Sequence, residues 1–330
     1  MNSPTCRVSV IICTRNRAAS LERTLRALDR ITIPPGWNAE LLLVDNASTD
    51  GTARVIQGSS PTGFAVRHLA EDRPGLSYAR NTGIAAARGE AILFTDDDVV
   101  PAKDWLERLA SPLLAGRFDA VVGPIAIAAA LQRPWMKPIH RQWLAGLDAD
   151  PGEELELVGA NMGLGRSVLR RVPGFDVELG AGAMGFGEES LFSLQLKTAG
   201  FRIGFADQAT VVHEFDSSRL LHAEWIGAAR KRGQLQAYLL HHWFHDSLRQ
   251  PRLRELWLTA KLNLRRILRP PGPPAGEGCP VWEMSYVRQI ARCRQFVIER
   301  RRPANYPASQ ANPCTPPPAE QRNIGRGRAA

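Results

Sequence analysis

Short apolar runs alternate with amphipathic segments along the first hundred residues of the chain. Runs rich in β-branched residues and leucine predict strands over residues 7–14, 39–46, 64–69 and 90–95. Between these runs, the spacing of Leu21, Leu25 and Leu28 predicts a helix with one apolar face, and residues 75–89 predict another. Strands that alternate with helices pair in parallel, so the pattern predicts an α/β fold with a single, mostly parallel, Rossmann-like sheet flanked by helices.

The pattern is less regular beyond the first hundred residues. A helix introduced by Pro101 is predicted over residues 102–114. After a mixed segment, the alternation closes with a helix and two strands, over residues 188–200, 201–206 and 209–214. These boundaries predict a first domain over residues 1–216.

The remainder of the chain has a different character. Residues 217–269 predict a helical, basic extension, and residues 270–330 predict a Pro/Arg-rich linker, a short helix at 281–301 and a disordered tail. A helix over residues 252–269 would carry an apolar face made of Leu253, Leu256, Trp257, Ala260, Leu264, Ile267 and Leu268.

The two parts of the chain differ in their balance of basic and acidic residues. Residues 217–330 hold 20 Lys and Arg against 7 Asp and Glu, whereas the first 216 residues hold 22 against 26. The helix at 252–269 could therefore rest on an anionic membrane surface. The alternative, which we favour at this stage, is a helix packed on the first domain with solvated arginines. A nucleic-acid-binding protein is a third interpretation, although no recognition motif accompanies the charge.

Cysteine content and hydropathy indicate the environment of the protein. The five cysteines are scattered and form no CxxC pair, which favours a reducing compartment. No apolar run approaches the length needed to span a membrane. We therefore expect a cytoplasmic protein that is soluble, or at most peripheral at the inner face of the membrane.

Three of the predicted strands end in polar residues, namely Thr14-Arg15-Asn16, Asp45-Asn46 and Asp96-Asp97-Asp98. Each group alone is typical of a turn or a helix cap. However, the carboxyl ends of parallel strands meet at one edge of a sheet, where α/β proteins bind their ligands. The three groups together therefore favour a nucleotide-type site at this edge.

The aspartate triplet has two interpretations. If the strand continues, Asp96 and Asp98 point to one side and Asp97 to the other. Two convergent carboxylates suit a hard divalent cation such as Mg²⁺ or Mn²⁺. Alternatively, Asp98 caps the helix that follows. The spacing favours neither interpretation. If Asp97 faces the other way from two metal ligands, it is the member of the triplet expected to tolerate substitution best.

Five motifs, taken in order, resemble inverting glycosyltransferases of family 2, which have the GT-A fold. They lie within residues 7–215 and read VSVIICTRNR, LLLVDNASTDGT, RPGLSYARNTGIAAARGEAILFTDDDVV, GFGEESL and VVHE. The resemblance implies transfer of a sugar from a nucleotide-diphosphate sugar to a hydroxyl of a glycan or lipid-linked glycan. It also implies a divalent metal cofactor, Mg or Mn, and a part in cell-envelope polysaccharide synthesis.

The resemblance assigns nucleotide contacts to particular positions. It implies that Thr14 and Arg15 border the nucleotide and that Asp45 hydrogen-bonds its base. Arg80 and Asn81 would lie near the phosphates or the ribose. From the residues alone, Asp45 is equally typical of a turn, and Arg80 is equally typical of a solvated helix face.

The resemblance likewise implies a metal site and a general base. Asp96 would contact the ribose or the metal, Asp98 would bind the metal, and His213 would be a further metal or diphosphate ligand. Glu188 and Glu189 open a helix, where acidic residues often only complement the helix dipole. The family pattern has Glu-Asp here, so Glu189 is the expected base and Glu188 the fallback. A catalytically weak scaffold that binds sugar nucleotides would carry the same motifs.

Overall fold

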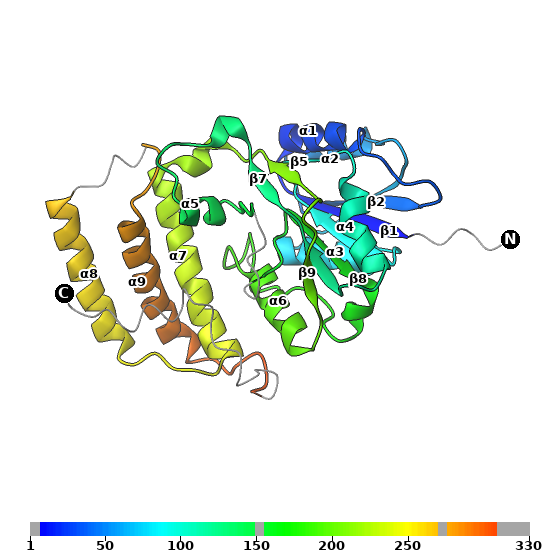
Figure 1. The fold of residues 1–330 in the computed structure, drawn as a ribbon. Helices are drawn as coiled ribbons and strands as arrows, with labels where there is room; N and C mark the ends of the chain where they lie inside the picture. The colour runs from blue at the N-terminus through cyan, green and yellow to red at the C-terminus, as the bar shows by residue number, and fades with distance from the viewer. Residues whose placement is uncertain (1–6, 149–154, 270–275, 309–330) are drawn as a thin grey trace.

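The apolar strands near the start of the chain form one side of a seven-stranded sheet, from its edge to its centre (Figure 1). The computed structural model describes residues 7–148, 155–269 and 276–308. In spatial order, the strands are β3 (Phe64–Ala70), β2 (Ala39–Asp45), β1 (Val8–Thr14), β4 (Ala91–Thr95), β8 (Asn161–Gly165), β6 (Ala120–Val122) and β9 (Ile203–Phe205). β1 pairs in parallel with β2 and β4, whereas β8 is antiparallel to its neighbours β4 and β6. The predicted α/β fold with a mostly parallel sheet is therefore confirmed.

Helices cover both faces of this sheet. They are α1 (Ala18–Leu28), α2 (Thr52–Gln57), α3 (Leu76–Ala86), α4 (Trp105–Leu114) and α6 (Glu188–Thr198). Because side chains alternate along a strand, Val10 and Ile12 of β1 pack on the face covered by α1 and α4. Ile11 packs on the opposite face, with α3 and α6. All three side chains are fully buried, so β1 lies at the centre of the hydrophobic core.

A second, smaller sheet begins directly after the aspartate triplet. It contains β5 (Val99–Pro101), β10 (Val211–His213) and β7 (Ile125–Ile127). The helix predicted to begin at residue 102 begins only at Trp105, because residues 99–101 pair with β10 instead. In this antiparallel pair His213 lies opposite Val99, the residue that follows Asp98. The small sheet therefore brings a late histidine to the end of β4.

Three long helices form a layer beside the sheet: α7 (His222–Tyr238), α8 (Pro251–Leu268) and α9 (Val281–Glu299). α9 lies between α7 and α8, and α8 is the outermost element (Figure 1). The layer shares its core with Trp143 of α5 (Pro138–Trp143), so it is packed onto the middle of the chain. The expected linker and tail fall mostly on residues 270–275 and 309–330, which lie outside the described residues.

A buried carboxylate joins the three helices of this layer. Glu283 of α9 is fully buried, and its Oε2 lies 2.8 Å from Nε2 of His222 on α7. Its Oε1 accepts a hydrogen bond of 2.8 Å from Nε of Arg266 on α8. Cys279 lies near enough to His222 and Glu283 for the three to hold a metal ion. Since both Glu283 oxygens already have protein partners, we assign this cluster a structural role that fixes the rotation of α8.

The broad apolar face of α8 points to solvent, which is the opposite of the packing favoured from the sequence. Its large side chains are 56–78% exposed; they are Leu253, Leu256, Trp257, Leu264, Ile267 and Leu268. The helix packs instead through Leu258 and Leu262, which are 3% and 5% exposed and belong to the helical core. The arrangement with an inward apolar face is therefore wrong, because the pair between Arg266 and Glu283 turns the opposite side of α8 toward α9.

Truncating the two faces of α8 should have unequal effects. Leu262→Ala should lower the free energy of unfolding by about 3 kcal/mol, because it leaves a cavity against α9. Leu264→Ala removes the same atoms from the solvent side of the same helix and should change it by less than about 0.5 kcal/mol. Urea unfolding followed by circular dichroism measures both, and equal losses would contradict this orientation.

Candidate active site

A pocket of about 350 Å³ lies at the carboxyl ends of the central strands. Of the residues predicted from the sequence, those that line it are Thr14, Arg15, Asp96, Asp98 and His213. Thr14 ends β1, the aspartates follow β4, and His213 ends β10. The edge at which the sequence predicts a ligand site is therefore hollowed in the structure.

All three aspartates of the triplet line this pocket. The chain turns at residues 97 and 98, so the alternation expected of a continued strand does not apply. Oδ2 of Asp97 accepts a hydrogen bond of 2.6 Å from Thr14, and its Oδ1 lies 3.0 Å from Nε of Arg17. Burial raises the pKa of Asp97 to about 7, against the opposing effects of Arg17 and Thr14. The prediction of an outward-facing Asp97 is therefore wrong.

Asp98 is paired on both of its oxygens and does not cap a helix. Its Oδ1 lies 3.2 Å from Nε2 of His213, and its Oδ2 accepts a 2.6 Å hydrogen bond from Arg17. Burial tends to raise the pKa of Asp98, but the contacts with His213 and Arg17 hold it below its ordinary value. The N-cap position of α4 is taken by Asp104, so the capping interpretation of Asp98 is wrong.

The orientation of His213 suits it to bind a cation together with Asp98. Its Nδ1 lies 3.0 Å from the carbonyl oxygen of Leu144, and a carbonyl only accepts, so Nδ1 carries the proton. In the neutral ring, Nε2 then presents its lone pair to the Asp98 carboxylate. Two acceptors that face one another at 3.2 Å require a proton or a metal ion between them. These two side chains therefore fit a divalent cation.

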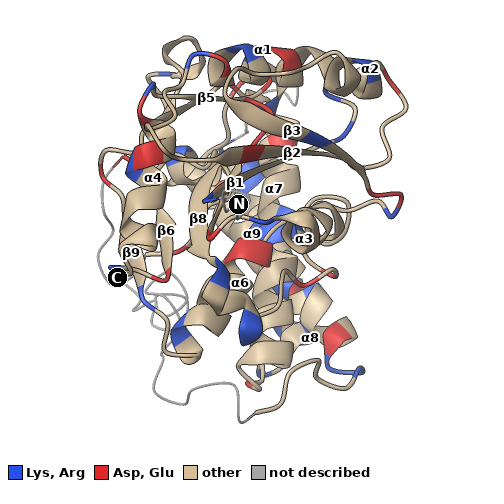
Figure 2. Cartoon of the chain, turned by 90° about the vertical axis from the view of Figure 1, so that its right-hand side faces the viewer, with Lys and Arg blue, Asp and Glu red and all other residues tan. Residues whose placement is uncertain are grey.

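Arg80 of α3 connects the triplet with the first turn of α6. Its Nη2 lies 3.8 Å from Oδ1 of Asp96, and its Nη1 donates to Glu188 at 2.8 Å and to Glu189 at 3.0 Å. The first turn of α6 is visible as an acidic segment in Figure 2. Arg80 is only 2% exposed, and although burial lowers its pKa, the three carboxylates more than compensate and raise it. The guanidinium therefore stays charged inside the protein.

Asp96 lies in the same pocket as Asp98 and His213, and its carboxylate also lies 3.8 Å from Nη2 of Arg80. Burial raises the pKa of Asp96, and Arg80 opposes the shift. Within the described residues, Asp96 does not form a close three-ligand group with Asp98 and His213. The structure thus sets Asp98 and His213 in direct contact, with Asp96 in the same pocket but outside that contact.

The two glutamates of α6 have different surroundings. Glu188 is buried, its Oε2 has no hydrogen-bond partner, and burial raises its pKa to about 8. The side chain of Glu189 is 21% exposed. A Cβ atom at Gly159 would lie 1.9 Å from Nη2 of Arg80 and 2.6 Å from Oε1 of Glu189. Only glycine at position 159 permits this contact, a requirement that the sequence pattern does not reveal.

Two predicted nucleotide contacts are engaged locally in this structure. Oδ1 of Asp45 accepts a hydrogen bond of 3.1 Å from the backbone N–H of Ser48, at the sheet edge beside Thr14. The side-chain amide of Asn81 donates a hydrogen bond to the carbonyl oxygen of Phe175 and accepts one from its backbone N–H, each at 2.8 Å. Asn81 does not line the pocket of the aspartates, so the site described here does not include it.

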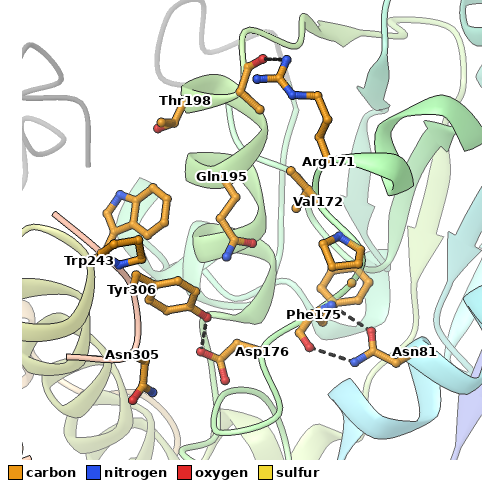
Figure 3. A pocket seen from close by; sticks show the side chains of 14 residues that line it. Asn81, Arg171, Val172, Phe175, Asp176, Gln195, Thr198, Trp243, Asn305 and Tyr306 are labelled. Carbon is orange, nitrogen blue, oxygen red and sulfur yellow. Dashed lines mark hydrogen bonds between the residues drawn. The ribbon is translucent and has the colours of Figure 1, made fainter. Parts of the chain in front are cut away.

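Asn81 lines a larger pocket of about 810 Å³ instead (Figure 3). Polar groups there pair with one another: the Tyr306 hydroxyl donates to Asp176 at 2.6 Å, and Asn81 binds the Phe175 backbone. No other residue predicted from the sequence lines this pocket. Its size therefore does not make it the better candidate for the chemistry.

Sequence reasoning missed two arginines of the site. Arg17 follows the predicted Arg15 by two positions and binds both Asp97 and Asp98. Arg219, in a 3₁₀ turn over Ser217–Leu220, also lines the pocket, although it lies beyond the predicted end of the domain. Burial lowers the pKa of Arg219, and Asp98 opposes the shift. Arg17 could have been found from the sequence, because it directly follows the polar residues at the end of the first strand. No sequence pattern pointed to Arg219.

The buried Glu188 should make stability depend on pH. Because its folded-state pKa is raised, the native protein holds this proton more tightly than the unfolded chain, so stability falls as pH rises from about 4.5 to about 8. Glu188→Gln should remove up to about 1.4 kcal/mol per pH unit of that slope. Urea unfolding of both proteins across this range measures it, with Glu107→Gln, at an exposed residue, as the control. Parallel curves for Glu188→Gln and the parent protein would exclude a raised pKa.

Comparisons with known proteins agree with this geometry. Residues 9–172 match the family model described as Glycosyl transferase family 2. Glycosyltransferase AglE of Haloferax volcanii is 38% identical over 119 residues, which is 36% of this chain and 39% of AglE. Succinoglycan biosynthesis protein ExoM of Rhizobium meliloti is 26% identical over 268 residues, covering 79% of this chain and 82% of ExoM.

A solved structure has a similar fold. The mannosyltransferase PcManGT from Pyrobaculum calidifontis, in complex with GDP-Man and Mn²⁺, aligns with a TM-score of 0.59 at 21% identity. The alignment covers 89% of this chain and 88% of PcManGT, so the likeness extends through the helical layer. The chain therefore belongs to glycosyltransferase family 2, and its fold is of the GT-A type.

Proposed function

We propose that this protein transfers a sugar from a nucleotide-diphosphate sugar to an acceptor hydroxyl, with inversion at the anomeric carbon. The observation that carries the proposal is the ion network of Arg80, which joins Asp96 to Glu189. The carboxylate in this network that could act as a base is that of Glu189. It would lie beside the sheet edge that carries Asp98 and His213. A donor site and a proton acceptor thus share one buried arginine.

The pocket holds arginines that could bind a nucleoside diphosphate, beside the three aspartates. Arg17 and Arg219 line it together with Thr14 and Arg15, which we assign to the diphosphate and the nucleotide. Asp45, at the same sheet edge, would turn from Ser48 to bind the base. Among structures with this fold, PcManGT was solved with GDP-Man, and Staphylococcus aureus TarS, at a TM-score of 0.51, was solved with UDP.

Asp98 and His213 would hold a divalent cation, Mg²⁺ or Mn²⁺. The hydrogen bond of His213 to Leu144 keeps its Nε2 available for a metal. When bound, such an ion supplies positive charge that stabilises the departing nucleoside diphosphate. Arg17 now binds the Asp98 carboxylate and would be released toward the diphosphate. Asp96, whose carboxylate lies 3.8 Å from Arg80, would contact the ribose or the metal.

Glu189 would act as the general base. Its carboxylate takes the proton of the acceptor hydroxyl while that oxygen bonds to the anomeric carbon. The bond between the anomeric carbon and the diphosphate oxygen breaks on the opposite face, so one displacement inverts the centre. Glu188 is the poorer base near neutral pH, because its raised pKa keeps it mostly protonated there. Arg80 orients Glu189 and offsets the negative charge of both glutamates.

We propose a glycan or a lipid-linked glycan as the acceptor. The support comes from ExoM, whose name describes succinoglycan biosynthesis and whose similarity spans most of both chains. This assignment places the protein in cell-envelope polysaccharide synthesis.

Removing the Asp98 charge should abolish metal-dependent donor binding. Asp98→Asn should eliminate the thermal stabilisation by Mn²⁺ plus the preferred donor in a panel of UDP-, GDP-, dTDP- and CDP-sugars, because the metal loses its anionic ligand. Asp104→Asn changes an exposed aspartate nearby and should retain the shift. An unchanged shift in Asp98→Asn would refute the metal assignment.

Replacing the base should slow the chemical step and spare donor binding. Glu189→Gln should lower kcat about 10²- to 10⁴-fold while donor KM stays within a few-fold, because the amide cannot accept the acceptor proton. Glu188→Gln should have a smaller effect on kcat. Steady-state transfer assays with each variant measure this, and a larger loss in Glu188→Gln would move the base to Glu188.

A further inference from the structure

The outward face of α8 is the largest apolar feature that the proposed reaction does not use. Six large side chains between Leu253 and Leu268 are each more than half exposed. They recur at helical spacing, so they form one continuous stripe along the 18-residue helix, about 27 Å long. In Figure 1, α8 is the outermost helix, and α9 separates it from the rest of the protein. The stripe therefore lies on the outer side of the molecule.

Basic side chains border this stripe. Residues 251–269 contain six Lys or Arg and a single acidic residue, Glu255, which pairs with Arg294 of α9 at 2.6 Å. Arg252, Lys261 and Arg269 are exposed. The Lys261 ammonium lies 3.7 Å from the ring centre of Trp257 within the stripe. A cation against an exposed tryptophan is an arrangement suited to the boundary between lipid headgroups and acyl chains.

The rest of the chain is poorly suited to cover this stripe. The segments outside the described ranges hold one residue among Leu, Ile, Val, Phe and Trp, namely Ile324. That single side chain cannot match six. In addition, no helix in the described ranges is long and apolar enough to cross a membrane. The composition of these segments therefore favours an occupant other than them.

We propose that α8 docks the protein onto an anionic membrane surface. The helix lies in the plane of the interface, with Trp257, Leu264 and Ile267 inserted among the acyl chains. Its basic border contacts anionic headgroups. Leu258, Leu262 and the pair of Arg266 with Glu283 hold the opposite side of the helix to α9, so the apolar stripe is presented without any unfolding. This docking does not depend on the transfer reaction.

Vesicle flotation of the full-length protein tests the proposal. The protein should float with vesicles that contain phosphatidylglycerol, float weakly with phosphatidylcholine alone, and lose binding as salt rises. Leu264→Gln/Ile267→Gln should reduce partitioning at least about tenfold. Val177→Gln, at an exposed apolar residue away from α8, is the matched control and should bind like the parent.

Three outcomes would overturn the proposal. One is equal flotation of the parent and the double variant. A second is equal binding to neutral and anionic vesicles. The third is a dimer in lipid-free buffer, by light scattering, that the double variant dissociates, since the occupant would then be a second copy of the chain. The donor-induced thermal shift, measured on the same variants, should be unchanged and reports on the proposed function separately.

Discussion

The buried guanidinium of Arg80 is the interaction on which the site depends. It is charged, nearly inaccessible to water, and surrounded by carboxylates from two other parts of the chain. A buried charge is costly unless it is paired. Burying Arg80 of α3 therefore requires the carboxylates at the end of β4 and at the start of α6 to lie beside it. The same constraint explains why position 159 has no side chain, because a Cβ there would collide with the arginine. Asp96 and the two glutamates are consequently held around one guanidinium.

The small second sheet supplies the other half of the site. A turn after β4 sends the chain into β5, whose antiparallel partner β10 ends in His213. This pairing sets the histidine against Asp98, and the hydrogen bond to Leu144 fixes which nitrogen faces the carboxylate. Three separate regions of sequence thus meet around the contact between Asp98 and His213. The turn also brings Asp97 inward, where Thr14 and Arg17 bind it.

The helical layer serves as a support and as a surface. Its core takes in Trp143 from the middle of the chain, and Glu283 links its three helices through His222 and Arg266. These contacts leave the wider apolar stripe of α8 facing outward. The sequence pattern of α8 was correct about which residues share a face, but it could not show which face packs. That choice depends on the partner helix. Two leucines and one ion pair make the contact with the rest of the layer, and the six apolar side chains stay exposed.

The amino-acid sequence by itself determined the order of strands and helices, the parallel sheet and the sheet edge where Asp45, Asp96 and Asp98 gather, because apolar periodicity and strand exits are local properties. The family could also be recognised from five local motifs. Only the tertiary structure decided the inward turn of Asp97, the pairing of Asp96 with Arg80, and the entry of Arg17 and Arg219 into the pocket. Those features depend on charges and backbone segments that are distant in sequence, and no local pattern records which of them will meet.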